Sequence, residues 1–155
     1  MLSTKQSLEQ LRQRIRSLVG AERRDMCWEI GYFQTPIAVK EPGEAPFNPY
    51  MVVCIDTESR AVMGSDLLKE PPSPQDFLSL LVDSMEAPSV GKGGSVIPRS
   101  VRLKDSAALK LLETELNQLG TEFELVKALP FLREFAKITE REFFPRLARS
   151  GSKHN

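Results

Sequence analysis

An apolar run at residues 51–55 ends in Asp56 and is followed by the polar residues 57–60 and a second apolar stretch at residues 61–64. A strand with one wet face alternates apolar and polar residues, whereas an unbroken apolar run is typical of a strand buried on both faces. The short polar break is typical of a hairpin turn. We therefore predict a β-hairpin whose first strand lies at the centre of a sheet.

Four segments have the pattern of helices. In each of them, apolar residues recur at spacings of three and four, which places these residues on one side of a helix. Ser73 followed by Pro74 is also a typical N-cap and first helical residue. The predicted helices begin at residues 8, 73, 106 and 130 and end near residues 20, 85, 119 and 149.

Further strands are predicted at residues 28–39, 101–104 and 123–125, where aromatic and β-branched residues gather or alternate with polar ones. Residues 40–50 contain three prolines and a glycine, which predicts a loop. A strand, a helix and a second strand in succession typically form a parallel crossover. The order predicts an α/β (α+β) fold, a single mixed β-sheet with helices packed on it.

Charge is balanced over the 155 residues, with 21 basic and 21 acidic side chains, which argues against a general polyanion binder. Along the chain it is uneven, because residues 1–24 hold six basic and two acidic side chains and residues 133–155 hold six and three. Two interpretations stay open: a basic arm for an anionic partner, or basic ends that fold back onto an acidic body. Nucleic acid is a conceivable partner but not the favoured one.

We predict three parts: an N-terminal amphipathic helix within residues 1–24, a single α/β domain over residues 25–149, and a disordered polar tail at residues 150–155. The amphipathic helices at the two ends are candidate contacts for a second copy of the chain or another protein partner. The first helix equally fits simple docking on the domain's own core.

The sequence predicts a cytoplasmic protein that does not enter a membrane. No window approaches eighteen consecutive apolar residues, and the first twenty residues lack the apolar core of a signal peptide. Cys27 and Cys54 fit neither a disulfide framework nor the paired spacing of a zinc site, which favours a reducing compartment.

Two predicted strands end in aspartate, Asp56 and Asp105, and the last predicted helix carries Glu140. This order, with spacings of 49 and 35 residues, resembles that of the ribonuclease H-like superfamily, which includes retroviral integrases and transposases. The resemblance implies that the three carboxylates bind two Mg²⁺ ions for phosphodiester chemistry. The residues alone equally fit local roles, Asp56 in a turn and Asp105 at the start of a helix.

Four longer phrases extend over residues 28–135: IDTESRAVMGSDLL, PPSPQDFLSLLVDSM, IPRSVRLKDSAALKLLETELNQLG and ELVKALPFLREF. They resemble an uncharacterised bacterial domain family that is common in cyanobacteria. The resemblance implies a cytoplasmic bacterial protein and brings no established activity or catalytic residues.

The main functional prediction is a noncatalytic binding or assembly module without a cofactor. It is based on the absence of a strong catalytic constellation, since the single histidine, His154, belongs to the polar tail. The alternative is a divalent-metal-dependent nuclease or nucleotidyl transferase with Mg²⁺ at Asp56, Asp105 and Glu140.

Overall fold

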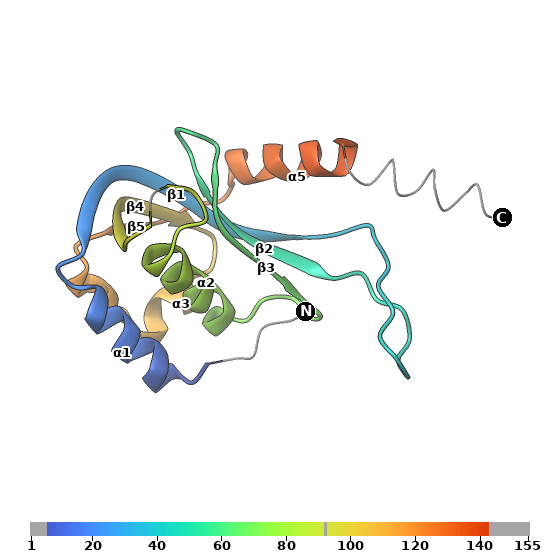
Figure 1. Ribbon diagram of the computed structural model, residues 1–155, viewed down its shortest axis with the longest axis horizontal. Coiled ribbons are helices and arrows are strands. Elements are labelled where there is room, and N and C mark those ends of the chain that lie inside the picture. Colours follow the sequence, from blue (N-terminus) through green and yellow to red (C-terminus); the bar gives the residue numbers. More distant parts are fainter. Residues whose placement is uncertain (1–5, 92, 143–155) are drawn as a thin grey trace.

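The computed structural model describes residues 6–91 and 93–142 (Figure 1). The helices are α1 (Leu8–Leu18), α2 (Pro74–Glu86), α3 (Ser106–Leu111), α4 (Glu113–Gln118) and α5 (Pro130–Glu142). The strands are β1 (Glu22–Gln34), β2 (Tyr50–Asp56), β3 (Val62–Leu68), β4 (Val96–Leu103) and β5 (Glu122–Leu125).

Within the described residues, the strands form one sheet in the order β3-β2-β1-β4-β5. The first three strands are antiparallel neighbours, β4 runs parallel to β1, and β5 runs parallel to β4. The predicted mixed sheet and the predicted hairpin of β2 and β3 are therefore confirmed. The predicted centre of the sheet is wrong, because β1 and not β2 lies in the middle.

Composition explains why β1 was predicted as a strand but not as the centre of the sheet. Glu29 and Gly31 interrupt the apolar residues of β1, and a charged residue and a glycine are both uncommon inside strands. Both are nevertheless buried, Glu29 completely. The strand is covered on both faces although its sequence reads as only partly apolar.

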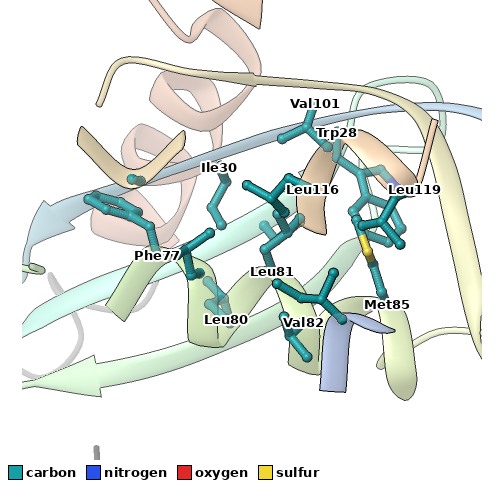
Figure 2. Close-up of a cluster of buried hydrophobic side chains, with 14 of the residues drawn as sticks. Trp28, Ile30, Phe77, Leu80, Leu81, Val82, Met85, Val101, Leu116 and Leu119 are labelled. Carbon is teal, nitrogen blue, oxygen red and sulfur yellow. The ribbon is translucent and has the colours of Figure 1, made fainter. Parts of the chain in front are cut away.

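Helices cover both faces of the sheet. Successive β1 side chains point to opposite faces, and Trp28 and Ile30 point into the larger core, which α1, α2, α3 and α4 cover (Figures 1 and 2). Figure 1 shows α5 on the other side of the sheet. The smaller core on that side consists of Val53, Ile55, Leu129 and Leu132.

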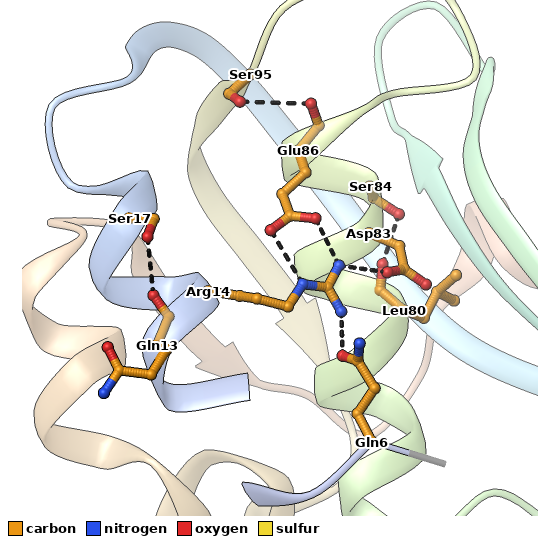
Figure 3. Close-up of polar contacts among 9 residues, drawn as sticks. All are labelled: Gln6, Gln13, Arg14, Ser17, Leu80, Asp83, Ser84, Glu86 and Ser95. Carbon is orange, nitrogen blue, oxygen red and sulfur yellow. Dashed lines mark hydrogen bonds and ion pairs between the residues drawn. The ribbon is translucent and has the colours of Figure 1, made fainter. Parts of the chain in front are cut away.

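The first helix docks on the domain's own core. Its apolar stripe, exposed by 2% or less, consists of Leu11, Ile15 and Leu18. On its polar side, Arg12 pairs with Glu115 of α4 at 2.7 Å. Arg14 pairs with Glu86 and Asp83 of α2 at 2.6 Å, as Figure 3 shows. Arg12 and Arg14 thus pair with acidic residues of the body, which agrees with the second interpretation of the charge pattern for these two residues.

The other helices largely follow their sequence signals. α2 begins at the predicted cap, Ser73. The helix predicted from Ser106 is divided into α3 and α4, because Leu112 has non-helical backbone angles, φ −132° and ψ 45°. The N-cap residue of α3 is Asp105. α5 is described as far as Glu142, and the predicted tail at residues 150–155 lies outside the described residues. None of the described helices has the length and hydropathy needed to cross a bilayer.

Candidate functional site at the carboxyl end of the central strand

The structure separates the two aspartates that were predicted to share a metal site. Asp56 lies opposite Trp28 of β1, whereas Asp105 follows the end of β4, beyond the level of Ile30. Because β2 runs antiparallel to β1 and β4, its carboxyl end lies at the other end of the sheet. The distance along the strands is roughly 13 Å, and two strand spacings add roughly 10 Å across them.

Each aspartate has a local role instead. Oδ2 of Asp56 accepts hydrogen bonds from the main-chain N–H and the hydroxyl of Ser59, at 3.0 and 2.6 Å, in the hairpin turn. Oδ1 of Asp105 accepts from the N–H of Ala107 at 2.9 Å and so caps α3. These are the turn and helix-start roles that the residues alone also allowed.

Glu140 does not complete a metal site. It is exposed on α5, about one helical turn beyond Ala136. Over residues 6–91 and 93–142, no group of three or more His, Cys, Asp or Glu side chains is placed to hold a metal ion. The carboxylates of Asp56, Asp105 and Glu140 therefore do not converge on one centre.

Sequence reasoning missed a carboxylate in the central strand, Glu29. Its Oε1 accepts a hydrogen bond from the N–H of Leu132 at 2.9 Å, at the start of α5, whereas Oε2 is buried without a partner among the described residues. Burial raises the pKa of Glu29, and the N–H groups of α5 and the charge of Arg102 oppose this shift. The signal in the sequence that could have identified this buried carboxylate is a glutamate between Trp28 and Ile30 within a strand pattern.

A cleft of about 910 Å³ opens at the carboxyl ends of β1 and β4. Four consecutive residues of β1, 30–33, line it, together with residues 103–106 at the end of β4 and the start of α3. Pro72 and Phe77 form the wall on the α2 side, and Leu132 and Arg133 form the wall on the α5 side. In sheets of this kind, ligands bind at the carboxyl ends of the strands.

Three basic side chains line this cleft: Lys104 after β4, Lys127 after β5, and Arg133 in α5. All three are exposed. Among the described residues, no ion pair involves any of the three. Asp105 is the single acidic residue in the lining, so the charge of the cleft is positive.

The α2 side of the cleft is aromatic. Tyr32 is 46% exposed. Its ring lies 6.0 Å from that of Tyr50 and 6.1 Å from that of Phe77, both in tilted arrangements. The cleft thus offers an apolar, aromatic wall beside a group of positive charges, a combination typical of binding pockets.

Gly31 shapes the α5 side of the cleft. A Cβ at this position would lie 2.7 Å from Cδ1 of Leu129 and 3.0 Å from Cδ1 of Leu132. Only a residue without a side chain lets the start of α5 approach the sheet this closely. The same approach brings the N–H of Leu132 within reach of Glu29.

The strand order, with α5 on the face opposite the other helices, defines a ribonuclease H-like α/β domain. The catalytic core domain of the HTLV-2 integrase, solved in complex with magnesium in a dimeric form, resembles the chain with a TM-score of 0.55. The two share 12% sequence identity over 81% of this chain and 74% of that one, so the likeness shows the fold. The chain belongs to the family described as Domain of unknown function (DUF6930), whose model matches residues 14–138. No curated protein matches the chain.

The cleft does not fit a divalent cation. One carboxylate oxygen of Glu29 accepts a hydrogen bond from α5, and the residue is completely buried. One carboxylate oxygen of Asp105 accepts the capping hydrogen bond of α3. The basic residues of the cleft lining are Lys104, Lys127 and Arg133. Positive side chains repel a metal ion and attract an anion.

Proposed function

We propose that this protein is a noncatalytic binding module that holds an anionic ligand in the cleft at the carboxyl ends of β1 and β4. The observation that carries the proposal is the convergence of Lys104, Lys127 and Arg133, from three separate segments, on one cleft without ion-pair partners among the described residues. Charged groups that are not neutralised internally attract a ligand of opposite charge.

The alternative, a metal-dependent nuclease or nucleotidyl transferase, is supported by the fold of the integrase core. A metal mechanism requires a cluster of carboxylates with free oxygens. The cleft instead has three cations and one aspartate that already caps a helix. Binding without catalysis is therefore the function that the geometry supports best.

We place this binding in the bacterial cytoplasm. Cys27 and Cys54 are both free thiols, and Cys54 is buried. Free cysteines of this kind are typical of reducing compartments, which supports the proposed location. Localising a fluorescent fusion and titrating the thiols of freshly prepared protein with a thiol reagent would test it.

A charge-reversal experiment tests the proposed site. We expect a fluorescein-labelled polyglutamate of about 15 residues, or an oligothymidylate of about 15 nucleotides, to bind with an affinity that falls as salt increases. The triple variant Lys104→Glu, Lys127→Glu, Arg133→Glu should bind at least about tenfold more weakly in fluorescence anisotropy.

The matched control changes the net charge equally at exposed positions outside the cleft lining. Arg16→Glu, Lys40→Glu, Lys110→Glu should keep most of the affinity, because only long-range attraction is lost. Circular dichroism confirms that both variants are folded. Equal losses in the two variants, or no binding of either probe by the wild type, would contradict an anion site in this cleft.

A further inference from the structure

The cleft borders the edge of a strand. Consecutive side chains of a strand point to opposite faces, so residues 30–33 of β1 line one cleft only if that cleft lies beside the strand. Pairing of β1 with β4 ends at Glu29 and Arg102, whereas its pairing with β2 continues to Gln34. Within the described residues, positions 31–34 therefore have a neighbouring strand on one side only.

The main chain of Tyr32 points into this gap. The carbonyl of Cys27 accepts from the N–H of Thr57 at 2.9 Å, and the N–H of Thr35 donates to Pro49 at 2.8 Å, so odd-numbered residues here turn toward β2. Alternation turns Tyr32 the other way. Its N–H and C=O form no main-chain hydrogen bond with any described residue.

The edge of the sheet formed by β3 is covered differently. On β3, the carbonyl of Met63 accepts from the N–H of Ser89 at 2.9 Å, and the N–H of Leu67 donates to the side chain of Asp66 at 2.9 Å. Main-chain groups of β3 are thus occupied by the chain itself, which discourages pairing with another strand. The edge of β1 beside the cleft has no such cover among the described residues.

The two walls of the cleft differ in chemistry. Tyr32 and Phe77 lie on the α2 side, and Arg133 lies on the α5 side. Lys104 follows Leu103, the last residue of β4, and lines the cleft together with Lys127. A strand placed in the cleft would turn alternate side chains toward aromatic rings and toward cations.

We propose that the ligand is an extended, acidic segment of a partner protein that adds to the edge of β1 at residues 31–34, with its acidic residues facing the α5 side and apolar residues facing Tyr32. This inference rests on the proposed function, since it names the ligand class of the same cleft. Main-chain hydrogen bonds supply the affinity in such strand addition, and side-chain pockets supply the specificity.

The probe is the peptide acetyl-Glu-Val-Glu-Val-Glu-Val-amide, titrated into the full chain and followed by calorimetry and by NMR of ¹⁵N-labelled protein. We expect binding that the Lys104→Glu, Lys127→Glu, Arg133→Glu variant reduces at least about tenfold. The isomer acetyl-Glu-Glu-Glu-Val-Val-Val-amide has the same charge without the alternation and should also bind at least about tenfold more weakly.

Two further measurements are specific to strand addition. Hydrogen exchange of the Tyr32 N–H should slow on binding while that of Gly31, which already faces β2, stays unchanged. N-methylation of the peptide at its valines or at its glutamates should give unequal losses, because only every second amide faces β1. Whether methylation of the valines or of the glutamates weakens binding more then shows whether the peptide runs parallel or antiparallel to β1.

The outcomes separate this inference from the proposed function. If the oligothymidylate binds in the cleft and the alternating peptide does not, the anion site stands and the acidic strand is overturned. If both N-methylated peptides bind equally, or Tyr32 exchange is unchanged, strand addition is likewise overturned. If neither the peptide nor any polyanion binds, both proposals fail.

Discussion

The carboxylate of Glu29, in the middle of the central strand, accepts a hydrogen bond from the main-chain N–H of Leu132 at 2.9 Å. The first N–H groups of a helix lack partners within the helix and favour a negative charge beside them. Glu29 thus holds the start of α5 against the sheet, and α5 in turn forms one wall of the cleft.

Glu29→Gln is expected to flatten the pH dependence of stability. Because burial raises the pKa of Glu29 above its ordinary value of 4.5, the folded state binds the proton more tightly than the unfolded state. Between 4.5 and the raised pKa, this group makes the free energy of unfolding fall as pH rises. Urea unfolding of both proteins from about pH 5 to about pH 7 measures the difference, and identical slopes would contradict the prediction.

Gly31→Ala should destabilise the fold by about 1 to 3 kcal/mol. The new methyl group would overlap Cδ1 of Leu129 at 2.7 Å and so push the start of α5 away from β1. Urea unfolding measures the loss. Combining the change with Leu129→Ala should make the two losses non-additive, because the second substitution removes the overlapping atoms. Strict additivity would show that the overlap is not the cause.

Asp56→Ala should cost about 1 kcal/mol of stability, because the N–H and hydroxyl of the exposed Ser59 lose their acceptor in the hairpin turn. Asp56→Asn keeps one acceptor oxygen and should cost less. Adding MgCl₂ at about 10 mM should shift the thermal midpoints of wild type and Asp56→Asn equally. A Mg²⁺-dependent stabilisation confined to the wild type would instead support a metal role for Asp56.

Arg14 should show a coupling energy of about 1 kcal/mol with Glu86, since the pair joins α1 to α2 and the Arg14 side chain is 21% exposed. The measurement is a double-mutant cycle with Arg14→Met and Glu86→Gln, followed by urea unfolding. Arg24 and Glu22, both more than half exposed, provide the control pair, for which we expect a smaller coupling. Equal coupling energies for the two pairs would mean that partial burial does not strengthen the Arg14–Glu86 ion pair.

Local signals in the sequence predicted which elements exist, and long-range relations were harder. The predicted bounds of two strands are wrong, because β1 covers Glu22–Gln34 instead of residues 28–39 and β4 covers Val96–Leu103 instead of residues 101–104. The Ser73 cap and the hairpin after Asp56 are encoded by neighbouring residues, and both are confirmed. The centre of the sheet was misplaced because Glu29 is buried through a contact with residue 132, which no local pattern contains. The sequence indicated this burial only through the position of a charged residue within an apolar strand.

The candidate site could not be assembled from spacing. Whether Asp56 meets Asp105 depends on the direction of β2 relative to β4, and that direction follows from the path of β1 and the loop at residues 35–49. The cations of the cleft come from three segments, and each of them alone reads as an ordinary surface residue. The positive charge of the cleft is a product of the fold.

The ion pairs of α1 also bear on the order in which the molecule is assembled. Arg12 pairs with Glu115, and Arg14 pairs with Glu86. The helix therefore contacts residues that follow it in the sequence by roughly 70 to 100 positions. During synthesis from the N-terminus, α1 leaves the ribosome well before the surface on which it docks exists. Docking of α1 therefore requires that α2 and α4 have been synthesised, and its apolar stripe has no surface to cover it before then.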